Sequence, residues 1–202
     1  MARSPRSHWG APYLFDQDDP RSTPETDLAT LRSILMGYMP RDQAQGRTRV
    51  EMLSFLLDHP DALERSCLEG HFTASALVVR AEGEAGLLTL HKKLKRWLQT
   101  GGHCDGDANL PAVALREATE ESGIQDLEVD PRPIDLDIHR IPSRPGEPEH
   151  WHLDTRFLVY APPEAVLVMS DESLDLRWMP YAEIDRIDTD DSVRRLFRIA
   201  FE

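Results

Sequence analysis

Residues 101–124 of the chain read GGHCDGDANLPAVALREATEESGI, and this stretch determines how the rest is interpreted. Asn109 is a residue type that caps helices, and Pro111 suits a first helical turn because its missing N–H has no helical partner there. Gly123 suits the left-handed position that follows a last turn. The stretch therefore predicts a helix over about residues 110–122.

Three glutamates share one face of this predicted helix. Glu117, Glu120 and Glu121 are spaced i, i+3 and i+4, and Arg116 borders them. A solvated acidic helix is one interpretation, since like charges at this spacing cost only about 0.2–0.5 kcal/mol per pair. A site for Mg²⁺ or Mn²⁺ is the other, because partly buried carboxylates need a cation and all-oxygen ligands select these ions. The double glycine at 101–102 favours the metal, since its backbone can approach an ion or phosphate closely.

The spacing of this stretch resembles the Nudix box, G-x5-E-x7-R-E-U-x-E-E-x-G-U, in which U is aliphatic. Seven of the specified positions match: Gly102, Arg116, Glu117, Glu120, Glu121, Gly123 and Ile124. Ala118 is a weak aliphatic residue, and Ala108 stands where the box has its first glutamate. The segments KLKRWLQTGGHCDGD, VALREATEESGI and EHWHLDTRFL are further similar to a group of bacterial Nudix proteins that carry a helical hairpin ahead of the core.

This resemblance implies an α/β/α sandwich with a mixed sheet, and an Mg²⁺- or Mn²⁺-dependent hydrolase that cleaves the diphosphate of a nucleoside-diphosphate-linked metabolite. By matching positions, Glu120 and Glu121 would be the principal metal ligands, aided by a carbonyl of the double glycine such as that of Gly102. Glu117 would bind the metal or act as general base, and Arg116 would orient a glutamate by a charge-assisted hydrogen bond. We therefore expect Glu117, Arg116 and Glu120 to be catalytic.

Ala108 removes one carboxylate from the box. Asp105 or Asp107 could replace it from an altered loop, or the carboxylate could be absent without loss of turnover. The departure also leaves open a non-catalytic Nudix module that binds a nucleotide or regulates a partner. Isoprenoid diphosphate isomerisation is suggested only by Cys104 and the nearby histidines, while the box itself reads REATEESG. Glu172 lies where many Nudix enzymes supply an additional carboxylate.

The remaining sequence divides into an arm, a helical hairpin and an α/β domain. Residues 1–26 are rich in proline and polar residues, which is typical of an extended or mobile arm that could dock through its aromatic side chains. Within residues 27–67, one helix is predicted from its cap Asp27 to Pro40 and a second over residues 50–57. A hairpin this small cannot fold alone, so we expect it to cover the core or to form a dimer interface.

Residues 68–202 alternate strands with helices. The runs FTASALVVRA and GLLTLHKK flank the turn EGEAG and predict a β-hairpin. Further strands are predicted in PIDLDIHRI, in HWHLDTRFLVYA and around LDLRWM, and an amphipathic helix from Ser192 to Phe201 ends the chain. Strands on both sides of a central helix predict a single α/β domain with a mixed sheet.

Polar side chains share one face of two successive strands: Asp135, Asp137 and His139 on the first, and His150, His152, Asp154 and Arg156 on the second. A register with His139 opposite His152 would merge them into one surface. Such a surface could line the substrate cleft, so His152 and Asp154 are assigned to substrate binding. A solvated sheet face and a separate His/Asp metal site are the alternatives.

The densest basic cluster, Lys92, Lys93, Lys95 and Arg96, precedes the double glycine. These side chains could attract a diphosphate, or they could simply be solvated in a loop between strands. We assign Lys92 and Arg96 to substrate binding, together with His103, which could instead fix its loop by a hydrogen bond.

Composition narrows the partners. The 202 residues hold 23 Lys+Arg against 36 Asp+Glu, a formal net charge of −13, which argues against nucleic acid or an anionic membrane as partner. No apolar run approaches the roughly 20 residues of a membrane span, and no signal peptide is recognisable. We expect a cytoplasmic protein that binds a small phosphorylated metabolite and, through the hairpin, could form a homodimer. The two cysteines form no C-x-x-C motif, and Cys104 is expected to be inert.

Overall fold

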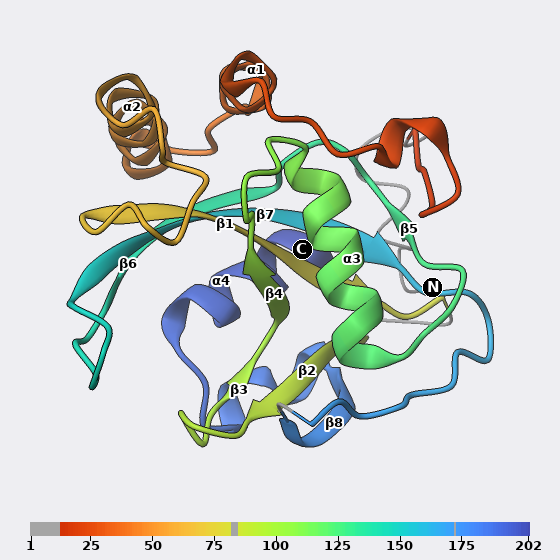
Figure 1. Ribbon diagram of the computed structural model, residues 1–202. Helices are drawn as coiled ribbons and strands as arrows, with labels where there is room; N and C mark the ends of the chain where they lie inside the picture. The colour runs from red at the N-terminus through yellow and green to blue at the C-terminus, as the bar shows by residue number, and fades with distance from the viewer. Residues whose placement is uncertain (1–12, 82–84, 172) are drawn as a thin grey trace.

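A mixed β-sheet with helices on both faces forms the centre of the molecule, shown in the computed structural model of Figure 1. The structure describes residues 13–81, 85–171 and 173–202. The helices are α1 (Leu28–Gly37), α2 (Gln43–Asp58), α3 (Leu110–Ser122) and α4 (Asp191–Phe201), with 3₁₀ turns η2 (Pro20–Ser22) and η3 (Tyr181–Arg186). The strands are β1 (Gly70–Val79), β2 (Ala85–His91), β3 (Trp97–Leu98), β4 (Thr100–His103), β5 (Glu128–Val129), β6 (Asp135–Ile141), β7 (His150–Tyr160) and β8 (Ser173–Pro180).

Strand β1 is the axis of the sheet and is buried along its whole length. It pairs in parallel with β7 over ten residues and antiparallel with β4 over four. It pairs antiparallel with β2 only at Val79 and Gly86, and β2 then diverges from it. Along its length β2 pairs with β8, and near its end it also pairs with β3. The predicted β1–β2 hairpin is therefore present, although its strands separate beyond the turn, part of which lies outside the described residues. This separation makes room for β4 beside β1.

The helices cover the two faces of the sheet unequally. Helix α3 lies in front of the sheet in Figure 1, while α4 lies behind it. Leu31 of α1, Met52 of α2 and Val113 of α3 are fully buried in one continuous cluster with β1 and β7, and Phe197 of α4 belongs to a second cluster. The hairpin α1–α2 thus extends the core that α3 begins, as expected of an element too small to fold alone.

The predicted start of α1 is confirmed, but the helix ends at Gly37 rather than at Pro40, and the predicted start of α2 is wrong. Asp27 caps α1 by accepting a hydrogen bond from the Ala29 amide, as expected. Helix α2 begins at Gln43 rather than near Val50, because Asp42 caps it and its first turns are polar. The prediction missed these first turns because it relied on the spacing of apolar residues.

Gln45 is the buried residue of the otherwise largely exposed polar start of α2. Its side-chain amide donates to the carbonyl of Leu136 on β6 and accepts from the Leu136 amide, at 3.0 and 3.2 Å. The hydroxyl of Tyr38 also donates to the Gln45 carbonyl oxygen at 2.7 Å. These buried bonds fix α2 over β6.

The described part of the N-terminal arm, residues 13–26, packs against the body. Phe15 is buried and exchanges two backbone hydrogen bonds with Val129 on β5. The arm then crosses the start of α3, where the Asn109 side chain donates to the carbonyls of Arg21 and Thr23. Over these residues the arm is therefore docked on the body and includes the turn η2. Trp9, another aromatic candidate for docking, lies outside the described residues. Among the helices that the structure describes, none is both long and apolar enough to cross a membrane.

Candidate active site

Helix α3 and strand β4 form the walls of a cleft of about 860 Å³. Its lining includes the three glutamates Glu117, Glu120 and Glu121 from α3, together with Gly101 and Gly102 from β4. The helix spans the predicted residues, and Gly123 ends it with φ 67°, in the left-handed conformation that glycine adopts most easily. The structure therefore brings the predicted metal ligands to one cleft.

Glu117 is a partly buried carboxylate of the cleft, with its side chain 19% exposed. Its Oε1 accepts a 2.9 Å hydrogen bond from Nη2 of Arg116, which also donates to the backbone carbonyl of His103. Burial raises the pKa of Glu117 above its usual range, although the hydrogen bond from Arg116 opposes this. The charged form of such a buried carboxylate would be stabilised by a further positive charge nearby. Arg116 thus forms a charge-assisted hydrogen bond with one of the glutamates, and its role in orienting that glutamate stays a prediction.

The double glycine approaches the helix through its backbone. The Gly101 amide donates to Oε1 of Glu121 at 2.9 Å. A Cβ at Gly102 would overlap the Glu117 carboxylate, and one at Gly101 would overlap the Ser75 side chain and backbone. Both positions therefore need glycine for the close approach of strand and helix.

The loop before α3 answers the question raised by Ala108. Ala108 is fully buried, and its amide donates to the carbonyl of Glu25 in the arm at 2.5 Å. Asp107 accepts from the Glu25 and Asn109 amides, both at 2.9 Å. Asn109 is the N-cap residue of α3, as predicted, but its side chain makes no capping hydrogen bond and binds the arm instead.

Asp105 also has a partner outside the glutamate cluster. Its carboxylate forms two hydrogen bonds with Arg65, at 2.6 and 2.7 Å, and the hydrogen bonds from Arg65 lower its pKa against a smaller effect of burial. Both Asp105 and Asp107 line the cleft, yet each is engaged by other groups. The arm thus contacts the position of the missing glutamate through the Ala108 amide and the Asp107 carboxylate.

Strands β6 and β7 pair in the register that merges the two polar faces, with His139 opposite His152. The resulting polar face is buried rather than solvated: Asp154 and Arg156 are 1% and 2% exposed. Asp154 accepts hydrogen bonds from Thr73 and Ser75 on β1, and from Nε of Arg156 at 2.7 Å. The interpretation as a solvated face is therefore wrong, and Asp154 is held rigidly at the cleft wall.

Arg156 and Arg195 neutralise the buried carboxylates of Asp135 and Asp137. Arg156 pairs with Asp135 and Asp137, both at 3.3 Å, and Arg195 of α4 donates to the same two carboxylates. Burial raises the pKa of Asp135. For Asp137, the hydrogen bond from His139 and the charges of both arginines outweigh burial and lower the pKa. Arg195 was not recognised in the sequence, because nothing in an amphipathic helix shows which arginine faces a buried carboxylate.

Three histidine rings meet at the edge of the cleft. His71, His103 and His152 have ring centroids 4.9 to 5.1 Å apart. Burial is the largest cause of a lowered pKa in each, and His103 falls to about 4. His71 was not recognised in the sequence, although its alternation with Thr73 and Ser75 on β1 was a usable signal.

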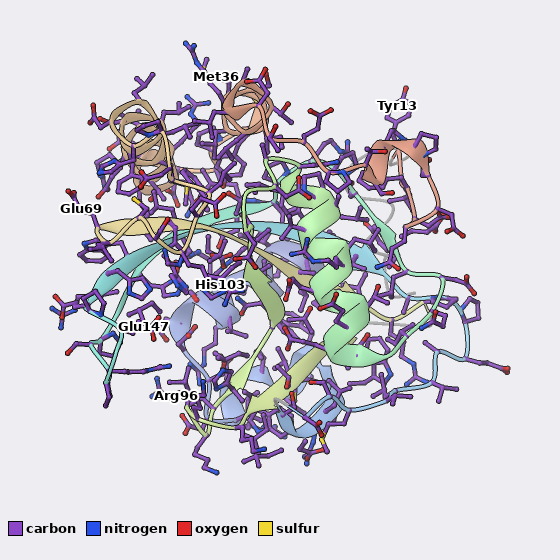
Figure 2. All side chains as sticks on the ribbon, in the orientation of Figure 1. Tyr13, Met36, Glu69, Arg96, His103 and Glu147 are labelled. Carbon is purple, nitrogen blue, oxygen red and sulfur yellow. The ribbon has the colours of Figure 1, made fainter. Side chains whose placement is uncertain are left out.

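The basic residues are less central than predicted. The Lys92 ammonium donates to the carbonyl of Asp171, and Arg96 pairs with Asp188 at 3.3 Å. Neither side chain lines the cleft, whereas Lys93 does. Figure 2 shows Arg96 at the lower end of the molecule, away from the central His103. Glu172 lies outside the described residues.

Comparisons with known proteins agree with this arrangement. The NUDIX domain family model matches residues 70–198, so the chain belongs to the Nudix family. A NUDIX-family hydrolase from Clostridium perfringens is 22% identical, with a TM-score of 0.51 over 65% of this chain and 95% of that one. An Ap4A hydrolase from C. elegans is 17% identical, with a TM-score of 0.52 over 63% and 93% of the respective chains. No curated protein sequence matches the chain significantly.

Proposed function

We propose that the chain is a hydrolase dependent on Mg²⁺ or Mn²⁺ that cleaves the phosphoanhydride of a nucleoside-diphosphate-linked or related small metabolite. One observation carries the proposal: the three glutamates of α3 and the double glycine of β4 line a single cleft large enough for such a ligand. The C. elegans structure of similar fold is an Ap4A hydrolase, and we extend its class of substrate to this chain as part of the proposal.

The residues of the cleft fit a hard divalent cation. Glu117, Glu120 and Glu121 offer only oxygen donors, which suit Mg²⁺ and Mn²⁺. The raised pKa of Glu117 indicates that burial disfavours its charged form, which a nearby cation would stabilise. The absence of a side chain at Gly102 leaves space beside the Glu117 carboxylate. Glu120, Glu121 and the Gly102 carbonyl would hold the ion, with Glu117 as a further ligand. When bound, the ion would neutralise phosphate oxygens and lower the pKa of a bound water.

The other residues would position groups or move protons. If Glu117 acts as general base instead of metal ligand, it would accept the proton of the attacking water, because burial makes it a stronger base than an exposed carboxylate. Arg116 would hold Glu117 in place through their 2.9 Å hydrogen bond. The 2.9 Å bond from the Gly101 amide would orient Glu121.

Substrate contacts would come from the wall of the cleft opposite α3. His103, His152 and Asp154 line it, and Lys93 lines the same cleft and would contact substrate in place of Lys92 and Arg96. We treat residues 27–67 as a hairpin that completes the core of the catalytic domain at 68–202, because both share one hydrophobic cluster. A homodimer through this hairpin is part of the same proposal.

A substrate panel tests the function. Nucleotide sugars, dinucleoside polyphosphates, ADP-ribose, NADH, CoA and nucleoside triphosphates are incubated with the protein and Mg²⁺ or Mn²⁺, and the products are separated by chromatography. We expect turnover of at least one class, and a loss of at least about 100-fold in Glu121→Gln. Glu51→Gln is the matched control, because Glu51 is exposed on α2, far from α3 in sequence.

Two results would contradict the proposal. Turnover that Glu121→Gln leaves unchanged would show that the glutamates are not the site. Saturable binding without turnover across the panel would instead support a non-catalytic nucleotide-binding module. The buried Ala108 favours this second function, since the box there lacks a carboxylate.

A further inference from the structure

Strand pairing brings three histidines from distant parts of the chain to one point. His71 on β1 is the direct partner of His152 on β7, and Thr73, two residues along β1, is the partner of His103 on β4. Side chains two residues apart on a strand share a face, so the three rings lie on the same side of the sheet. One ring nitrogen from each lies within 4.8 Å of the other two.

Among the described residues, none meets a ring nitrogen of His71 at normal hydrogen-bond geometry, although the backbone of Cys67 lies near enough to affect its pKa. His71 is only 3% exposed. Buried polar atoms in native proteins nearly always have a partner. The orphaned nitrogens of a ring that faces two other imidazoles therefore indicate a ligand that the protein chain itself does not supply.

The donors define which ligand fits. The group contains three imidazoles and no carboxylate, and burial keeps all three rings in the neutral form that metal binding requires. Neutral imidazole is a good ligand for Zn²⁺, Co²⁺, Ni²⁺ and Cu²⁺ and a poor one for Mg²⁺. The chemistry of this cluster thus differs from that of the glutamates on α3.

We propose that His71, His103 and His152 form a second metal site that binds Zn²⁺ or a similar transition-metal ion, with its fourth position open to the cleft. His103 and His152 both line the cleft that holds the glutamates, so a ligand on the open position would come from there. That position would take water or an oxygen of a bound phosphorylated ligand. Three protein ligands and one open position are typical of zinc sites that take part in chemistry.

The geometry needs only a small adjustment. Zn–N bonds of about 2.0–2.1 Å in a tetrahedral site place the nitrogens about 3.3 Å apart, so the rings would close by at most about 1.5 Å. His150 packs beside them, with its centroid 4.9 Å from that of His71 and its Nδ1 hydrogen-bonded to the Pro148 carbonyl. This neighbour limits how far His71 can move away from the cluster.

Zinc titration tests the site without reference to catalysis. Untagged protein is freed of metal with a chelator and titrated calorimetrically with Zn²⁺ in excess Mg²⁺, which occupies carboxylates. We expect one equivalent of Zn²⁺ to bind, and His103→Gln or His152→Gln to weaken binding by more than about 100-fold, the upper end of the loss caused by outer-shell substitutions. Circular dichroism of each variant shows whether it is folded.

Two controls separate this site from the others. His139→Gln changes a neighbouring histidine, whose ring centroid is 5.4 Å from that of His152, and should keep wild-type zinc affinity. Glu121→Gln should also keep it, even where it abolishes hydrolysis. Failure of the proposed hydrolase activity and failure of the zinc site are therefore distinguishable.

X-ray absorption at the zinc edge identifies the ligands directly. A shell with three imidazole nitrogens at about 2.0–2.1 Å supports the site, and this signature should be lost in His71→Ala where that variant folds. A shell made only of oxygens would place the ion at the carboxylates and overturn the proposal. So would the absence of zinc binding, or zinc affinity that neither His103→Gln nor His152→Gln alters.

Discussion

The carboxylate of Glu117 fills the space beside Gly102 in which any other residue would place its Cβ. Arg116 holds this carboxylate from the other side at 2.9 Å, and the Glu117 side chain is 19% exposed. Glu117 is therefore confined between the strand and the arginine. Its position depends on the absence of a side chain at Gly102.

Gly102→Ala should displace Glu117 while the fold survives, because the atom that must move is the end of a side chain. We expect kcat/KM on the substrate found in the panel to fall by about 100-fold, the cost of moving a catalytic group by about 1 Å. Calorimetric Mg²⁺ affinity should fall as well. Wild-type activity and Mg²⁺ affinity in this variant would show that Glu117 needs no fixed position.

Gly46→Ala is the matched control for that substitution. Gly46 lies inside α2, and an added Cβ would have no heavy atom within 4 Å. Alanine there should stabilise the protein by about 0.5–1 kcal/mol, because glycine loses more backbone freedom on folding. Urea denaturation measures the change, and activity should stay at the wild-type level.

Ala108→Glu restores the sequence of the box and should nevertheless destabilise the protein. Ala108 is fully buried beneath the arm, and its amide binds the Glu25 carbonyl. A glutamate would either bury a charge or displace the arm, so we expect a loss of at least about 2 kcal/mol in urea denaturation. Ala29→Glu, at an exposed alanine of α1, should change stability by less than about 0.5 kcal/mol. Equal effects of the two substitutions would show that the arm does not cover this position.

Gln45→Ala tests how the hairpin is attached to the sheet. It removes the partner of the Tyr38 hydroxyl and of both backbone groups of Leu136, all in a buried setting. Leaving buried polar groups unsatisfied costs about 1–3 kcal/mol, and we expect a loss in this range. Gln43→Ala, at an exposed position of the same helix, should leave the free energy of unfolding nearly unchanged. A similar loss in both variants would mean that helix propensity, not the buried bonds, matters.

Local signals in the sequence were sufficient for the helix of the site. The glutamate spacing and Gly123 located α3, and side-chain alternation located the polar face of β7. A register such as His139 opposite His152 follows from the same alternation if the two polar faces merge, because one shift of register would turn every polar side chain to the other face. These features depend on residues that are neighbours in the chain or in one strand pair.

Features that depend on distant segments were not predictable. His71 joins His152 because β1 and β7 pair in parallel, and no local pattern reveals the partner of a parallel strand. The arm over Ala108 and Arg195 beneath Asp135 are contacts of the same kind. The spacing of a sequence motif was therefore enough to find the glutamates but not the cluster of histidines beside them.

The histidine cluster should make the metal-free protein sensitive to mild acid. Burial lowers the pKa of His103 from 6.5 to about 4 and lowers those of His71 and His152 as well. Between pH 6.5 and about 4 the unfolded chain therefore binds more protons than the folded one, so stability falls as the pH falls. Each histidine that titrates adds a slope of up to about 1.4 kcal/mol per pH unit.

Urea denaturation from pH 8 to 4, in the presence of a chelator, measures this slope. The double variant His103→Gln/His152→Gln should show a flatter dependence in this window, because two of the groups that must stay neutral in the folded state are gone. His59→Gln should not flatten it, since the hydrogen bond of His59 to the Phe55 carbonyl raises its pKa and so acts in the opposite direction. A double variant as acid-sensitive as the wild type would mean that the three rings can be protonated in the folded protein, which their burial opposes.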